Sequence, residues 1–167
     1  MWGRIMSEFS GSPGQKKVIK LLLERGFSVN DDGRVVSGEI ELPDAGIARE
    51  VGVDRRVVDA TTEAILNDPE LREIFENISS IPSLRDVAPV LDLGVLIIAV
   101  EDASEEGVIA GISELIAEHG VSIRQAISDD PYFTDEPTFT VITNGEVPGE
   151  LVADIKKLDY VEKVDFR

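Results

Sequence analysis

The chain has 167 residues, 43% hydrophobic and 29% charged, a composition typical of folded globular proteins and not of disordered or fibrous ones. It contains no cysteine, which excludes disulfides, thiolate metal sites and cysteine nucleophiles and is compatible with a reducing cytoplasm. The longest apolar run, Val95–Val100, is too short to span a bilayer, and the N-terminus lacks the apolar region of a signal peptide. We therefore expect a cytoplasmic protein with no membrane partner.

The formal net charge of −17 is distributed unevenly along the chain. Residues 1–92 carry 11 basic and 17 acidic side chains, whereas residues 93–167 carry 5 and 16. An acidic surface favours solubility and says little about the fold. It also repels nucleic acid, so any contact with phosphate depends on a local group of lysines and arginines.

In chain order, the N-terminal part predicts a helical domain with a small hairpin. Apolar residues at helical spacing, followed by Gly26 as a C-terminal cap, predict the first helix. The turn signal at residues 30–33 lies between two short apolar runs, as in a hairpin. The expected elements are helices at 15–25, 43–52, 54–67 and 70–78, with strands at 27–29, 34–36 and 39–42.

Two prolines and no sustained periodicity make residues 79–92 a connector between domains at 1–78 and 93–167. The C-terminal pattern is strand, helix, strand, strand, helix, strand. Right-handed crossovers then predict one four-stranded antiparallel sheet with both helices on one face, a ferredoxin-like βαββαβ domain in an α+β protein. The expected elements are 95–100, 105–118, 122–128, 138–143, 150–158 and 161–166.

The segment Asp44–Ile65 has the pattern of two helices that meet at a tight corner. Such a corner needs a small residue at the crossing and a residue that adopts a left-handed backbone, and Ala48 and Gly52 fit these positions. These 22 residues resemble the helix-turn-helix of bacterial and archaeal transcription regulators. The alternative is a three-helix structural or interaction domain that contacts no DNA.

If the second helix reads DNA, its first turn points into the major groove. Asp54 is placed to cap this helix. Asp59 and Glu63 lie among its basic residues and oppose the approach of phosphate. The expected DNA-binding residues are Lys16, Lys17, Arg55, Arg56 and Thr61.

Residues Val95–Ile112 resemble the opening of ACT domains, which are small regulatory modules that bind amino acids. In that family a hydrophobic strand ends in an acidic residue, here Glu101–Asp102, and a short loop leads to a glycine, here Gly107, at the start of a helix. The resemblance implies ligand contacts from this loop and from the second strand of a neighbouring copy. The implied residues are Asp102, Ala103, Glu106, Gly107, Val108, Ile123, Arg124 and Gln125.

The chain departs from the ACT pattern at Glu105–Glu106, where an Arg-Pro-like pair often precedes the glycine. Two carboxylates suit the positive end of a helix dipole but repel an anionic ligand. The alternative is therefore an ACT-like fold whose ligand site is empty and which serves only for dimerisation.

From Trp2 to near its C-terminus, the chain resembles archaeal proteins described as predicted regulators of amino-acid metabolism, chiefly through Val53–Glu63 and Asp129–Pro137. The resemblance implies a transcriptional regulator that binds DNA through its helix-turn-helix and an amino-acid effector through its ACT domain. It also implies a homodimer or higher homo-oligomer. The alternative is a regulatory module that senses an amino acid and docks onto a biosynthetic enzyme without binding DNA.

The sequence offers no catalytic constellation, so we expect no enzyme, catalytic residue, cofactor or metal site. Its only histidine, His119, ends a predicted helix, where a cation is favourable to the helix dipole. No nucleophile elbow, phosphate-binding loop or dinucleotide fingerprint is present. The acidic loop at residues 129–136 has the wrong spacing for an EF-hand, and we expect it to be a solvated hairpin.

Overall fold

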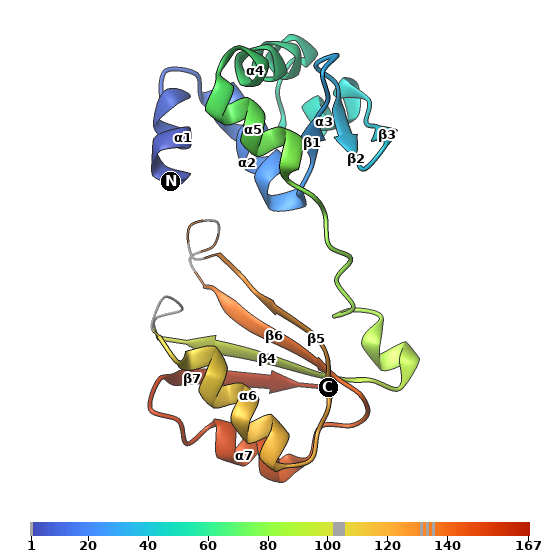
Figure 1. The fold of residues 1–167 in the computed structure, drawn as a ribbon, viewed down its shortest axis with the longest axis vertical. Coiled ribbons are helices and arrows are strands. Elements are labelled where there is room, and N and C mark those ends of the chain that lie inside the picture. Colours follow the sequence, from blue (N-terminus) through green and yellow to red (C-terminus); the bar gives the residue numbers. More distant parts are fainter. Residues whose placement is uncertain (1, 102–105, 131, 133, 135) are drawn as a thin grey trace. The chain divides into compact units, whose positions relative to one another are not determined.

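The computed structural model describes the chain at residues 2–101, 106–130, 132, 134 and 136–167. The chain divides into two compact units, Met1–Pro82 and Ser83–Arg167, and this division falls inside the predicted connector (Figure 1). Each unit combines helices with an antiparallel sheet, so the protein is α+β.

The first unit is helical, with a small three-stranded sheet in the order β1-β2-β3. Its buried core includes Ile19, Leu22, Ile65 and Phe75. The predicted helices and the hairpin are present, and a further helix at Trp2–Glu8, which was not predicted, precedes them. The elements are α1 (Trp2–Glu8), α2 (Pro13–Arg25), β1 (Ser28–Val29), β2 (Val35–Ser37), β3 (Ile40–Glu41), α3 (Asp44–Val51), α4 (Arg55–Asn67) and α5 (Pro69–Asn77).

Gly26 ends α2 as predicted, with a left-handed φ of 63° and its N–H bonded to the last turn. A side chain here would also collide with the chain, because a Cβ would lie 2.5 Å from the carbonyl oxygen of Ser79. The Ser80 hydroxyl donates to the carbonyls of Arg25 at 2.6 Å and Gly26 at 3.1 Å. The first unit therefore includes Ser79 and Ser80.

The second unit has the predicted order of strands and helices around one antiparallel sheet, β5-β6-β4-β7. Its first helix was predicted to start at residue 105 but starts at Val108, because Gly107 has a left-handed φ of 92° that no helix continues. Its second helix ends three residues earlier than predicted. The elements are the 3-10 helix η1 (Ala88–Leu91), β4 (Gly94–Val100), α6 (Val108–Glu118), β5 (Ile123–Ser128), β6 (Thr138–Thr143), α7 (Gly149–Ile155) and β7 (Val161–Phe166).

The two faces of this sheet are covered differently. Both helices pack on one face, as predicted, over a core that includes Ile98, Ile112 and Leu151 (Figure 1). On the other face, Ala88 of η1 is fully buried in a small cluster with Val95, Ile97 and Ile142 of the sheet. The second half of the connector is therefore part of this unit.

Candidate functional site

The corner between α3 and α4 has the local geometry predicted from the sequence. Gly52 adopts a left-handed backbone with φ 70°, and its N–H bonds to the carbonyl of Ala48. The Asp54 carboxylate accepts a hydrogen bond of 2.9 Å from the backbone N–H of Arg56 and so caps α4. The predictions for Gly52 and Asp54 are confirmed.

The first turn of helix α2 packs against α4, the second helix of this corner. A Cβ on Gly14 would lie 3.1 Å from a methyl group of Val57, so the two helices approach closely there. The Gln15 amide donates to the carbonyl of Ala60 at 3.1 Å. The N-terminal ends of α2 and α4 therefore lie beside one another.

Four of the predicted DNA-binding residues are exposed at these neighbouring helix ends. Lys16 and Lys17 lie in the first half of α2, and Arg55 and Arg56 open α4. Among the described residues, none of these four side chains forms an ion pair. Because the ends of α2 and α4 that carry them lie beside one another, we call Lys16, Lys17, Arg55 and Arg56 the basic cluster.

The prediction that Thr61 contacts DNA is wrong. Its side chain is fully buried, and its hydroxyl donates to the carbonyl of Val57 at 2.6 Å, one turn earlier in α4. The exposed face of the helix instead carries Asp59 and Glu63. Helical periodicity in the sequence did not distinguish Thr61 from its exposed neighbours.

A carboxylate pair that the sequence did not indicate lies beside the corner. Burial of Asp44 raises the pKa of its carboxyl, and the nearby Asp59, by charge and by hydrogen bonding, raises that pKa further. Arg34 opposes this shift through an ion pair of 3.1 Å with Asp44. Arg34 thus partly offsets the charge of Asp44 in α3, while Asp59 of α4 forms no ion pair among the described residues.

In the second unit, Gly107 forms the N-terminal cap of α6. Apart from its chain neighbours, no atom of the described residues lies within 4 Å of the position that a Cβ would occupy there. Glu106 is exposed and Val108 is buried in the core. The predicted ligand residues Asp102 and Ala103 lie outside the described residues.

The other predicted ligand residues lie on β5, at the edge of the sheet. Ile123 and Arg124 are exposed, while the Gln125 side chain accepts a hydrogen bond of 2.8 Å from the backbone N–H of Leu84. The register aligns Ile123 with Thr143, and Thr143 with Gly94, the first residue of β4. Ile123 therefore lies at the opposite end of the sheet from the loop after β4.

The two halves of the predicted ligand site are not brought together within one chain. Strands β4 and β5 both run antiparallel to β6 and so are parallel to each other. Ile123 is therefore level with the start of β4, whereas the predicted ligand loop follows the end of β4, six residues further on. At the ordinary rise of a strand, these two points are about 20 Å apart.

His119 lies where the sequence placed it, at the end of α6. One ring nitrogen contacts the carbonyl of Leu115 at 2.9 Å, and the other lies 3.2 Å from the Asp154 carboxylate. A hydrogen bond from Lys157 is the main cause that lowers the pKa of Asp154. These contacts tie the ends of α6 and α7 together and account for the histidine structurally.

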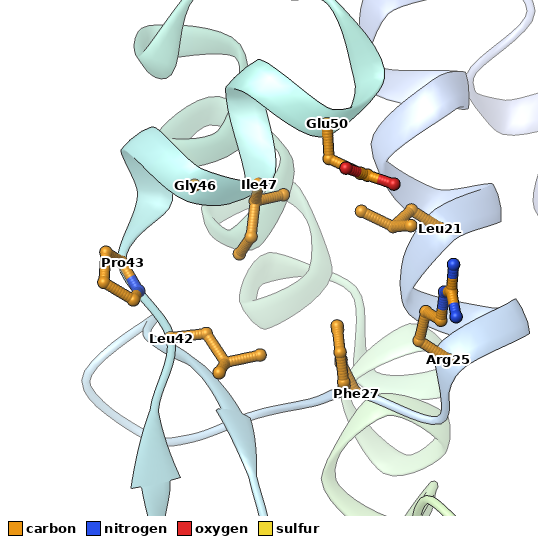
Figure 2. A pocket seen from close by; sticks show the side chains of 8 residues that line it. All are labelled: Leu21, Arg25, Phe27, Leu42, Pro43, Gly46, Ile47 and Glu50. Atoms are coloured by element: carbon orange, nitrogen blue, oxygen red, sulfur yellow. The ribbon is translucent and has the colours of Figure 1, made fainter.

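The first unit also has an apolar hollow of about 320 Å³ between α2 and α3 (Figure 2). Nothing in the sequence indicated it, because its lining comes from two stretches, residues 21–27 and 42–50, that are separated along the chain. The lining residues are Leu21, Arg25, Phe27, Leu42, Pro43, Gly46, Ile47 and Glu50. In the described part of the chain, no group of three acidic or histidine side chains is placed to hold a metal ion, and no helix has the length and hydropathy to cross a membrane.

Comparison with known proteins places the chain in no family. No family model matches it, and no curated protein does. Among solved structures it is similar to a homoserine dehydrogenase from Thiobacillus denitrificans, with 15% identity and a TM-score of 0.35. The match covers 68% of this chain and 28% of that chain, and a likeness this weak supports no conclusion about activity.

Proposed function

We propose that this protein is a cytoplasmic, ligand-responsive regulator of amino-acid metabolism, with a helix-turn-helix formed by α3 and α4 and a ferredoxin-like ACT domain formed by the second unit. It binds DNA through the helix-turn-helix and an amino acid through the ACT domain. It is not an enzyme and carries no cofactor. The observation that carries the proposal is the capped corner, which presents Arg55 and Arg56 on the first turn of α4.

The basic cluster supports DNA binding by its position. The first turn of a recognition helix enters the major groove, where arginine is the most frequent partner of guanine. Lys16 and Lys17 lie on the neighbouring end of α2, where lysines can contact the phosphates on either side of the groove. The local positive charge matters because the protein as a whole is acidic.

The start of α6 supports an amino-acid site. Free N–H groups at a helix N-terminus bind a carboxylate, and Gly107 leaves the backbone open to a ligand. The second half of the site lies about 20 Å away in the same chain by strand geometry. We therefore propose a homodimer or higher homo-oligomer in which Ile123, Arg124 and Gln125 of one copy approach the loop of another.

Coupling between the sites follows if the amino acid binds two dimer arrangements with different affinities. Each arrangement sets a different spacing between the two helix-turn-helix units, and DNA selects one spacing. The ligand then shifts the population toward or away from the DNA-binding arrangement.

DNA binding is tested by retention of genomic fragments at low salt, followed by selection of the enriched sequences. We expect the double substitution Arg55→Ala and Arg56→Ala to cost about 2–6 kcal/mol of DNA-binding free energy, since each base-contacting arginine contributes about 1–3 kcal/mol. Lys156→Ala, which removes an exposed lysine from the second unit, is the matched control and should change little. Equal loss in both variants, or no retention by the native protein, contradicts DNA binding.

The effector is tested by thermal unfolding in the presence of each of the twenty amino acids. A ligand of the native state raises the apparent stability, by about 2.7 kcal/mol at a hundredfold excess over its Kd. Arg124→Ala should reduce this gain without changing the stability of the unliganded protein, because Arg124 is exposed on an edge strand.

A second candidate function is docking onto a biosynthetic enzyme, with the amino acid as the signal. It is favoured by the exposed Asp59 and Glu63 on α4, which repel DNA but not a protein partner. Pull-down from a native lysate discriminates between the two. An enzyme partner that is retained by the Arg55→Ala, Arg56→Ala variant, with no enriched DNA, supports docking.

A further inference from the structure

The apolar hollow in the first unit has the size and lining of a small-molecule site. Figure 2 shows Phe27, Leu42 and Ile47 directed toward the same space, although they come from separate segments of the chain. Leu21 and Ile47 are largely buried, while Phe27 and Leu42 remain half-buried beside the opening. A volume of about 320 Å³ lies at the lower end of the range for ligand sites, so the hollow suits a molecule of amino-acid size.

Two side chains of opposite charge line this hollow. Arg25 comes from α2 and Glu50 from α3, and within the part of the unit that the structure describes neither forms an ion pair. By contrast, the neighbouring Lys20 and Glu24 are paired with each other at 3.6 Å. An adjoining hollow shares Arg25 and Glu50 and is also lined by the paired Lys20 and Glu24 and by Lys17. An unpaired cation and an unpaired anion thus border one apolar space.

We infer that this hollow binds a free α-amino acid with an apolar side chain. The guanidinium of Arg25 pairs with the ligand carboxylate, for which its planar fork is suited. The carboxylate of Glu50 pairs with the ligand ammonium group. The ligand side chain removes its own apolar surface and that of Phe27 and Leu42 from water.

Such a ligand bridges α2 and α3, and α3 is the first helix of the corner. Occupancy therefore acts on the corner directly, by fixing the separation of these two helices. This inference does not depend on the ligand site proposed in the second unit, since it uses different residues in a different unit.

The test is a titration of the full chain, labelled on its isoleucine, leucine and valine methyl groups, with L-leucine and L-phenylalanine. NMR should show shifts at Leu21, Leu42 and Ile47 for at least one of these probes. Two analogues of leucine each lack one charged group: 4-methylpentanoate has no ammonium and 3-methylbutylamine has no carboxylate. Each should bind roughly tenfold more weakly or worse, the loss expected for a hydrogen-bonded charge.

Gly46→Leu tests the location, because Gly46 lines the hollow within α3. Outside its own helical turn, no described atom lies within 4 Å of its Cβ position and its φ is not left-handed, so the helix accepts a side chain here, and we expect the leucine to occupy the hollow. We expect binding to be lost. Arg25→Gln and Glu50→Gln should each weaken it roughly tenfold or more. The matched controls Arg49→Gln and Glu73→Gln, which change exposed residues outside the hollow, should leave it unchanged.

The inference is overturned if neither probe shifts the methyl groups of the hollow, or if Gly46→Leu binds as well as the native chain. Shifts confined to Val108 and Ile123 would overturn it while supporting the ligand site proposed in the second unit. Shifts at Leu21, Leu42 and Ile47 alone would support it and leave that other site without a ligand. If Gly46→Leu fails to fold, as judged by circular dichroism, the two charge variants and their controls decide.

Discussion

The corner in the first unit and the ligand site proposed for the second differ in how much of each a single chain assembles. The corner is complete within one chain, since Gly52 ends α3, Asp54 caps α4, and the residues of the basic cluster lie at the neighbouring ends of α2 and α4. The ligand site is divided between Gly107 and Ile123, which lie at opposite ends of one sheet. The corner depends on local backbone geometry, whereas the proposed ligand site would need a second copy of the chain to be complete.

The largest expected effect is the destabilisation of the second unit by a core substitution, which tests whether the two units unfold independently. Ile98 is fully buried beneath α6 and α7, and Ile98→Ala should destabilise the second unit by about 2–5 kcal/mol. Hydrogen exchange should increase across β4–β7, while α2–α4 keep their protection. Val90→Ala, at a residue that is 84% exposed, is the control. Equal loss of protection in both units would show that they unfold together.

The next effect concerns the partner. Strand β5 is an edge of the sheet, and Ile123→Lys places a charge there that opposes pairing with a second copy. We expect self-association to weaken at least tenfold, about 1.4 kcal/mol, in sedimentation velocity. Glu162→Lys, on the opposite edge strand β7, is the control. If this control weakens self-association and Ile123→Lys does not, β5 is not the interface.

A smaller effect tests the local origin of the corner. Asp54→Ala removes the side chain that caps α4 and should cost about 1 kcal/mol of stability in denaturant unfolding. Asp54→Ser retains an acceptor and should cost much less. A similar loss in both variants would mean that tertiary packing, and not the cap, determines where α4 begins.

The smallest effect is the pH dependence of Asp44. Its pKa is raised, so its contribution to stability is fully present below the ordinary value of 3.8 and is lost as the pH rises through the folded value. Asp59→Asn removes one cause of the shift and should stabilise the protein by a few tenths of a kcal/mol, roughly, at neutral pH. The gain should vanish below pH 3.8 in acid unfolding titrations. A gain that persists there would point to a cause other than charge.

The sequence by itself determined the order of the elements other than α1 and η1, the ends of α2 and α3, and the cap of α4. These depend on neighbours along the chain: Gly26 and Gly52 accept a left-handed backbone, and Asp54 bonds two residues ahead. The four members of the basic cluster were named from the charges in the sequence, but only the packing of α2 against α4 places the helix ends that carry them side by side.

Only the tertiary structure decided which side chains face inward and which distant segments meet. Periodicity defines a helix face but not what covers it, so Thr61 was placed on the surface although α4 buries it. The pairing of Asp44 with Asp59 and the hollow between α2 and α3 arise where helices pack across the chain. The separation of Gly107 from Ile123 likewise follows from strand order, which the sequence of one strand does not contain.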